Sequence, residues 1–234
     1  MRDHEHAKLP DPREAPAYAL SEAAHYLDIP RATLRAWCLG QQYVRDGETR
    51  LFRPVLHIAD SRRGVLSFFN LIEAHVLDAL RRRHEVSLQK VRRALSFVSR
   101  AMPSTHPLAD KQFETDGLQL FVREYGRLVE ISAEGQLGLE QVLTVYLSRV
   151  ERNSLGEAVR LYPFTRNRVA SEPRAVVIDP RVAFGRPVLS GTGIPTAVIA
   201  ARLKAGETIE ELARDYGRAP IEIEEAIRCE LKAA

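Results

Sequence analysis

Two short apolar-patterned segments separated by a proline constrain the first forty residues most strongly. Between Glu22 and Leu27 the apolar residues recur on one face at helical spacing. The tripeptide Asp28-Ile29-Pro30 interrupts this pattern. A second helix is predicted from Arg31 to Leu39, because proline is tolerated where a helix begins and Gly40 favours its end. Two short helices joined by such a turn are typical of a helix-turn-helix.

The residues after this helix pair have the pattern of a β-hairpin. Tyr43-Val44 and Leu51-Phe52 flank Asp46-Gly47, and an Asp-Gly pair favours the tight turn between two antiparallel strands. A hairpin directly after the second helix is the wing of a winged helix-turn-helix. Two longer amphipathic helices are predicted beyond it, one capped by Ser67 and one capped by Ser87.

The central region is predicted to contain a small antiparallel sheet. Leu118, Leu120 and Val122 alternate with less apolar neighbours, residues 125–127 are expected to turn the chain, and residues 128–131 are expected to return it. A helix follows, with an apolar face that runs from Leu139 to Val150. Residues 160–175 are expected to be an extended arm.

The last segment is predicted to be a helical bundle. An apolar strand at residues 176–178 precedes a glycine-rich stretch, and three helices follow over about 196–204, 208–216 and 220–231. The last two form a pair like a helix-turn-helix. The fold class is therefore mainly α, within α+β. Its predicted parts are a flexible tail (1–16), a winged helix-turn-helix domain (17–102), a central hairpin, helix and arm (103–175), and a C-terminal helical domain (176–234).

Positive charge is concentrated in the first hundred residues, where 17 Lys and Arg oppose 12 Asp and Glu, although the whole chain carries only +3. A polyanion partner is best sought there. The alternative is an arginine excess that only keeps helices soluble. No apolar run is long enough for a membrane span or a signal core. Cys38 and Cys229, the two cysteines, fit a reducing cytoplasm, and they exclude a disulfide framework.

The second helix of the pair carries the residues expected to contact DNA. Leu34 and Trp37 are predicted core anchors, which leaves an outward face of Arg31, Thr33 and Arg35. Arginine binds guanine edges in a bidentate way and also binds phosphate. On the wing, phosphates or a minor groove are within reach of three further arginines, Arg45, Arg50 and Arg53. The alternative is a helix pair used only for packing.

The segment from Tyr18 to Trp37 resembles the opening of MerR-type winged-helix regulators. Thr33, Leu34, Arg35 and Trp37 match the family's recognition helix, and the resemblance covers roughly residues 18–100. It implies binding to double-stranded DNA. The metal-binding cysteines and long dimerisation helix of the metal-sensing members are absent, so metal sensing is not implied.

Residues 176–231 resemble domain-of-unknown-function family 433. The matching residues are Gly185, Pro187, the run from Gly191 to Pro195, and the segment that begins at Gly206. Members are mostly encoded beside PIN-like ribonuclease toxins and are regarded as their antitoxins. A longer form with a MerR-like head is similar to VapB-type antitoxins. From the residues alone, Gly191-Thr192-Gly193 is either a weak phosphate loop or, more simply, a turn that requires glycine.

This likeness implies an antitoxin that binds its own promoter and neutralises a PIN-like ribonuclease. The alternatives are a one-component MerR-like regulator that senses a small molecule, or an enzyme with an unrecognised site. No nucleophile elbow, P-loop, dinucleotide motif or metal-ligand spacing is present in the sequence. We therefore expect no enzyme activity, no cofactor and no metal.

Two contact surfaces are expected in the second half of the chain. The arm offers aromatic anchors flanked by arginine for a toxin, namely Arg160, Tyr162, Phe164, Arg166 and Arg168. The alternative is a strap whose Tyr162 and Phe164 pack on the chain's own core. Because the last helix is acidic, we do not expect it in a DNA groove. It is instead expected to form a homodimer, which suits a palindromic operator, through Ile221, Ala226, Ile227 and Leu231.

Overall fold

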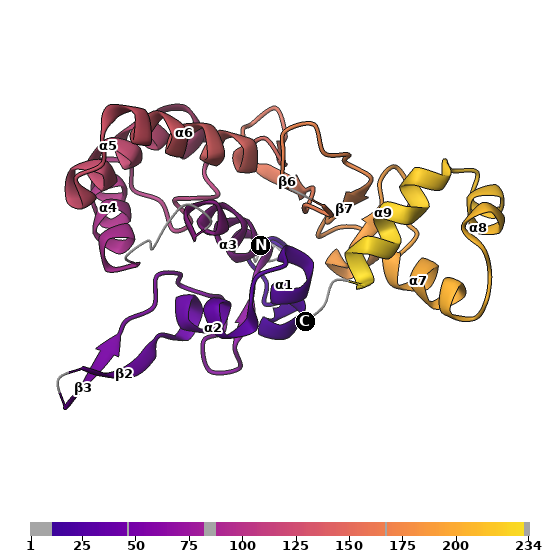
Figure 1. Cartoon of the computed structure of the whole chain (residues 1–234), viewed down its shortest axis with the longest axis horizontal. Coiled ribbons are helices and arrows are strands. Elements are labelled where there is room, and N and C mark those ends of the chain that lie inside the picture. Colours follow the sequence, from indigo (N-terminus) through magenta and orange to yellow (C-terminus); the bar gives the residue numbers. More distant parts are fainter. Residues whose placement is uncertain (1–10, 46, 82–87, 167, 232–234) are drawn as a thin grey trace, which may run out of the picture.

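The computed structural model describes residues 11–45, 47–81, 88–166 and 168–231, and it begins with the predicted winged helix-turn-helix (Figure 1). Helices α1 (Leu20–Leu27) and α2 (Arg31–Leu39) are followed by the wing, in which β2 (Gln41–Arg45) pairs antiparallel with β3 (Glu48–Phe52). A short sheet of β1 (Tyr18–Ala19) and β4 (Val65–Leu66), absent from the sequence prediction, closes this unit.

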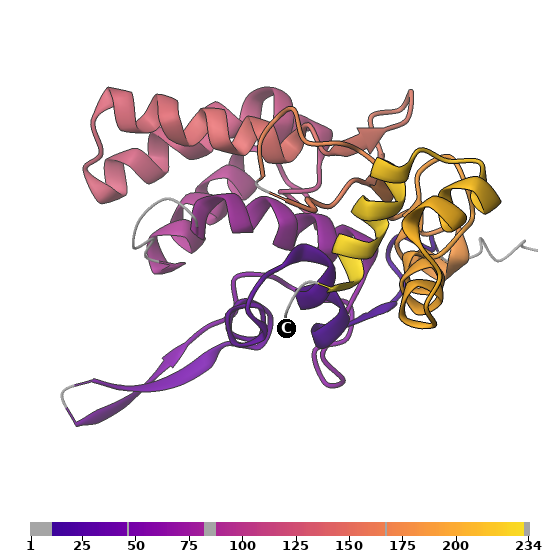
Figure 2. The same ribbon diagram turned by 45° about the vertical axis from the view of Figure 1, so that its right-hand side comes forward.

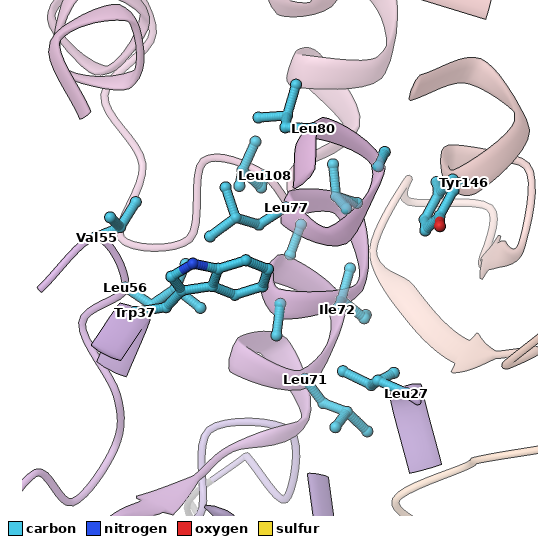
Figure 3. Packing of buried hydrophobic residues seen from close by; sticks show 14 of the residues in the cluster. Leu27, Trp37, Val55, Leu56, Leu71, Ile72, Leu77, Leu80, Leu108 and Tyr146 are labelled. Carbon is cyan, nitrogen blue, oxygen red and sulfur yellow. The ribbon is translucent and has the colours of Figure 1, made fainter. Parts of the chain in front are cut away.

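Helix α3 (Phe68–Arg81) lies at the centre of the molecule and is surrounded by other elements (Figures 1 and 3). The Ser67 hydroxyl accepts a hydrogen bond from the Asn70 amide, which confirms the predicted cap. The side chains of α3 that pack in the core on all sides include Leu71, Ile72, Val76, Leu77 and Leu80. The predicted cap at Ser87 lies outside the described residues.

The hairpin predicted over residues 118–131 is wrong, because this segment is helix α5 (Leu118–Val129). A π-helical turn (Phe113–Gly117) leads into α5, and α6 (Ala133–Leu147) packs against it, while α4 (Leu88–Ala101) lies on another side of α5. Gly126, expected in a turn, lies within α5. A Cβ atom there would lie 2.7 Å from the Gln136 side chain, so the glycine fits a close approach of the two helices.

The small antiparallel sheet of the central region lies after α6. It is formed by β5 (Val150–Arg152) and β6 (Ala158–Leu161), with a register shift at Glu151 and Arg152. Residues from the head and from the central region belong to one hydrophobic core. Residues 11–16 were expected in the flexible tail, yet Arg13 contacts Glu157 at 3.2 Å and stacks over Phe69. Residues 1–10 lie outside the described part of the chain.

The C-terminal part has a separate core and matches its predicted elements closely. Strands β7 (Val176–Val177) and β8 (Val188–Leu189) pair antiparallel, and helices α7 (Thr196–Lys204), α8 (Ile209–Tyr216) and α9 (Pro220–Leu231) follow. Gly191 has a φ of 73°, which supports its interpretation as a turn that requires glycine. No helix of the described residues is long and apolar enough to cross a membrane.

The two parts of the molecule meet where α1 lies against α9 and the β7–β8 region (Figure 2). Gly185 has a φ of 76°, and a Cβ atom on it would lie 2.4 Å from the Tyr18 hydroxyl. Arg186 binds the Glu22 carboxylate and donates a hydrogen bond to the Tyr26 hydroxyl at 3.1 Å. A side chain at position 185 would therefore force the Tyr18 side chain or the turn at residue 185 to shift.

Candidate nucleic-acid interface

The buried side of α2 fixes this helix on the core. Leu34 and Trp37 are buried, as predicted, as is Ile29 just before the helix, and Figure 3 shows the Trp37 indole beside Leu77 of α3. The Trp37 carbonyl accepts hydrogen bonds from the Val55 amide at 2.8 Å and the Leu56 amide at 3.0 Å. The chain that leaves the wing is thereby attached to the end of α2, so helix and wing are held in one arrangement.

The opposite side of α2 presents the predicted residues to solvent. Arg31 and Arg35 are exposed and Thr33 is partly buried. Among the described residues, neither arginine has a carboxylate within ion-pair distance. Free guanidinium groups one helical turn apart are suited to bind phosphates or guanine edges.

The wing carries the other predicted arginines. Arg45 lies at the end of β2 opposite Glu48, and Arg50 lies in β3 opposite Tyr43. The side chains of Arg45 and Arg50 lie outside the described part of the structure. Arg53 follows β3 and is exposed. The helix and hairpin are therefore placed as a winged helix-turn-helix requires, with a cation at the base of the wing.

Arg92 of α4 stabilises the base of the wing. Its Nε donates to the Pro54 carbonyl at 3.1 Å, its Nη2 donates to the Arg53 carbonyl, and its guanidinium stacks on Phe52 at 5.0 Å. Burial and the nearby charge of Arg53 lower the pKa of Arg92. The sequence gives no sign that Arg92 contacts the wing, because the contact joins residues 38 and 39 positions apart in the chain.

The aromatic residues of the arm pack largely within the protein. Phe164 is buried against His75 and Tyr146, with ring centroids 5.5 Å and 4.9 Å apart. The Tyr162 hydroxyl donates to Glu151 at 2.5 Å. These contacts favour the strap interpretation over a toxin-binding arm.

The arginines of the arm connect the two parts of the molecule. Arg168 lies 2.5 Å from Asp28 in the turn of the helix-turn-helix, and Arg166 pairs with the buried Glu225 of α9. Arg160 pairs with Glu151 at 2.7 Å. Each of the three arginines therefore has an acidic partner within the protein.

A buried arginine that the sequence did not reveal fixes the strap. Arg149 is 1% exposed, stacks on Phe164 at 5.0 Å, and donates to the carbonyls of Tyr162, Pro163, Glu172 and Pro173. Burial lowers its pKa to about 10. Four carbonyl partners compensate a charge that is otherwise costly to bury.

Acidic residues of α9 have ion-pair or hydrogen-bond partners within the protein. Glu222 pairs with Arg218 at 2.5 Å, Glu224 pairs with Arg228 at 3.0 Å, and Glu230 accepts from the Thr196 hydroxyl at 2.5 Å.

Two of the four residues predicted for dimerisation, Ala226 and Ile227, are buried in the C-terminal core, whereas Ile221 and Leu231 are exposed. Within the described residues, no cluster of three or more His, Cys, Asp or Glu is placed to hold a metal ion.

A helix-turn-helix followed by a wing, with exposed arginines on its second helix, is the arrangement found in a class of DNA-binding proteins. Comparison with family models agrees, because residues 16–95 match the family described as "Putative DNA-binding HTH domain". Residues 176–228 match a "Protein of unknown function (DUF433)". The likeness of the head to MerR-type regulators stays a prediction.

Two curated proteins and one crystal structure from Mycobacterium tuberculosis match nearly the whole chain. The chain is 29% identical to "Putative antitoxin VapB45" of strain H37Rv, over 92% of this chain and 93% of the relative. It is 24% identical to "Uncharacterized protein Rv2308", over 90% of this chain and 88% of the relative. The crystal structure of Rv2018 superposes with a TM-score of 0.66 at 25% identity, over 92% and 98% of the two chains. The chain is thus a homologue of a putative antitoxin and combines a helix-turn-helix domain with a DUF433 domain.

Proposed function

We propose that the protein is a cytoplasmic antitoxin of a type II toxin–antitoxin system that represses its own promoter and neutralises a PIN-like ribonuclease. The proposed DNA binding rests on the exposed face of α2, where Arg31 and Arg35 have no acidic partner among the described residues. The likeness to "Putative antitoxin VapB45" over nearly both chains supports the toxin-binding half. The protein acts by binding in this proposal, without a cofactor.

The DNA-binding half assigns α2 to the major groove. Arg31, Thr33 and Arg35 then face base edges, while the wing arginines bind phosphates or a minor groove. A homodimer would place two such helices on a palindromic operator. Ile221 and Leu231 remain available for its interface, because both are exposed on α9.

We assign toxin binding to the surface around Phe184 and not to the arm of residues 160–175. The phenyl side chain is 96% exposed, and it follows Ala183 in a turn where both residues have left-handed φ angles, 47° and 55°. Each non-glycine residue in this conformation costs about 1–2 kcal/mol. An exposed aromatic side chain on such a turn is an anchor of the kind that dominates protein interfaces.

Co-expression with the product of the adjacent gene tests the proposal. A tagged chain is expected to retain a small acidic PIN-like protein on an affinity column and to relieve its growth inhibition. Phe184→Ala is expected to weaken this capture at least tenfold, whereas the exposed control Leu155→Ala leaves it unchanged. Failure of the wild-type chain to bind any neighbour product would overturn the antitoxin function. Equal capture by Phe184→Ala would reject only the assigned surface.

A further inference from the structure

A cavity of about 730 Å³ lies between the base of the wing, α4 and the segment after α4. Its volume is within the range of sites for small organic ligands. Apolar side chains form part of its lining, among them Val55, Leu95 and Leu108. Val55 and Leu108 belong to the edge of the main core shown in Figure 3.

The polar side of the cavity is positively charged. Arg53 and Arg92 both line it, and neither has a carboxylate within ion-pair distance among the described residues. Among the described residues, Glu73 is the one acidic residue of the lining, and its carboxylate already accepts from the side-chain amide (Nδ2) of Asn70 at 3.2 Å and lies 3.0 Å from His106 Nδ1. The cavity therefore combines an apolar wall with two cations that lack a counter-ion.

Arg92 retains a donor for a ligand. Its bonds to the Pro54 and Arg53 carbonyls engage Nε and Nη2, and no partner of Nη1 is found among the described residues. Ser96 lies one turn further along α4 and also lines the cavity, together with Ser99. A carboxylate, sulfonate or phosphate placed here would receive charge-assisted hydrogen bonds and hydroxyl donors.

We infer that this cavity is a binding site for a small organic anion with an apolar body. The acidic group of the ligand binds Arg92 and Arg53, and its apolar part lies against Val55, Leu95 and Leu108. Arg92 also supports the backbone at the base of the wing, so the acidic group of the ligand contacts a residue that holds the wing in place. This inference goes beyond the proposed antitoxin function and does not depend on it.

Titration of the full-length chain with the fluorescent anion anilinonaphthalene sulfonate tests the site. We expect one saturable site per chain with a blue-shifted emission. Arg92→Gln is expected to weaken binding about tenfold or more, since a hydrogen bond to a charged group is lost. The control Arg93→Gln removes an exposed arginine next to it on α4 and is expected to leave the affinity unchanged. The neutral probe phenyl-naphthylamine is expected to bind at least tenfold more weakly than the anion.

Ser96→Trp provides a second variant that leaves the bonds of Arg92 intact. Ser96 is exposed at the cavity, so an indole there can fill the space without disturbing the core, and loss of the saturable site is expected. Circular dichroism and thermal unfolding verify that each variant is folded. Absence of saturable binding to the wild-type chain would overturn the inference. Equal binding by wild type, Arg92→Gln and Ser96→Trp, or equal affinity for the neutral probe, would also overturn it.

Discussion

The α1–α2 pair and the α8–α9 pair have similar local construction. The first helix of each pair ends at a left-handed residue, Asp28 with a φ of 52° and Gly217 with a φ of 63°. A proline stands at the start of each second helix, Pro30 before α2 and Pro220 as the first residue of α9. Helix-turn-helix geometry alone therefore does not distinguish the two pairs.

The charges of the second helices differ. Arg31 and Arg35 of α2 are exposed and have no acidic partner among the described residues. On α9, Arg228 is held by Glu224 at 3.0 Å and by Glu225 at 2.8 Å. Cations paired within the protein are not available for phosphates, and the acidic residues around them repel DNA. Free charge, more than the motif, is therefore the reason we propose that α2 binds DNA.

Removal of the free arginines is expected to have the largest effect. The double variant Arg31→Ala/Arg35→Ala should lower affinity for promoter DNA about 100-fold, since each contact is worth about 1–3 kcal/mol. Fluorescence anisotropy at fixed salt measures this. The matched control Arg214→Ala/Arg228→Ala removes the same charge from α8 and α9 and should leave the affinity unchanged. Equal losses in the two double variants would contradict the comparison.

Acidification is expected to destabilise the N-terminal part through His75. Burial lowers the pKa of His75 to about 4, against about 6.5 in the unfolded chain. The neutral side chain is thus favoured in the folded state, and its stabilising contribution is complete above pH 6.5 and falls between pH 6.5 and 4. The expected loss between pH 7 and pH 5 is about 2 kcal/mol.

Urea unfolding followed by Trp37 fluorescence measures this loss as the difference between wild type and His75→Leu. Because wild type and His75→Leu both contain His106, the opposing contribution of His106 cancels when their unfolding free energies are subtracted. Burial disfavours the charged form of His106, but hydrogen bonds to Glu73 and Glu14 raise its pKa overall. A difference independent of pH would show that His75 does not carry the acid response. All seven histidines precede residue 107, so this response is specific to the N-terminal part.

Loss of the Glu225 charge should affect the C-terminal part. Glu225 is buried and binds Arg166, Arg228 and the Thr165 hydroxyl. We expect Glu225→Gln to lower the free energy of unfolding by about 1–2 kcal/mol, because both arginines are partly solvated. The control Glu224→Gln breaks a more exposed pair and should cost less than about 0.5 kcal/mol. A stability of Glu225→Gln equal to that of the control would reject a structural role for this pair.

Loss of the Arg186 contacts between the C-terminal part and α1 is expected to have the smallest effect on stability. Arg186→Ala removes the contacts to the partly exposed Glu22 and to the Tyr26 hydroxyl, and a loss of about 0.5–1 kcal/mol is expected because Arg186 itself is largely exposed. Promoter affinity should change less than twofold. A large loss of DNA binding by a folded Arg186→Ala protein would mean that the C-terminal part positions α2.

Local patterns predicted the two helix pairs well and the central region poorly. The turn at Asp28-Ile29-Pro30, the wing and the three C-terminal helices each carry their own signals, and the fold class is confirmed. In α5, apolar residues satisfy two periods. Leu118, Leu120 and Val122 alternate as in a strand, while Leu118, Phe121, Val122 and Tyr125 form the face that the helix buries.

The long-range contacts of the candidate site were not accessible from sequence. Arg92 reaches the wing from α4, and Arg149 binds carbonyls 13 to 24 residues away. From the sequence, an arginine among polar residues that faces solvent cannot be distinguished from one that binds buried carbonyls. The exposed arginines of α2 were predictable, because the apolar positions of the same helix determine its outward face.

Hydrogen exchange of the full chain with and without promoter DNA tests the central assignment most directly. We expect bound DNA to slow amide exchange in α2 and the wing, residues 31–52, and to leave exchange in residues 209–231 of α8 and α9 unchanged. Protection of residues 209–231 with no change in residues 31–52 would contradict the assignment to α2 and would assign DNA binding to the acidic helix pair.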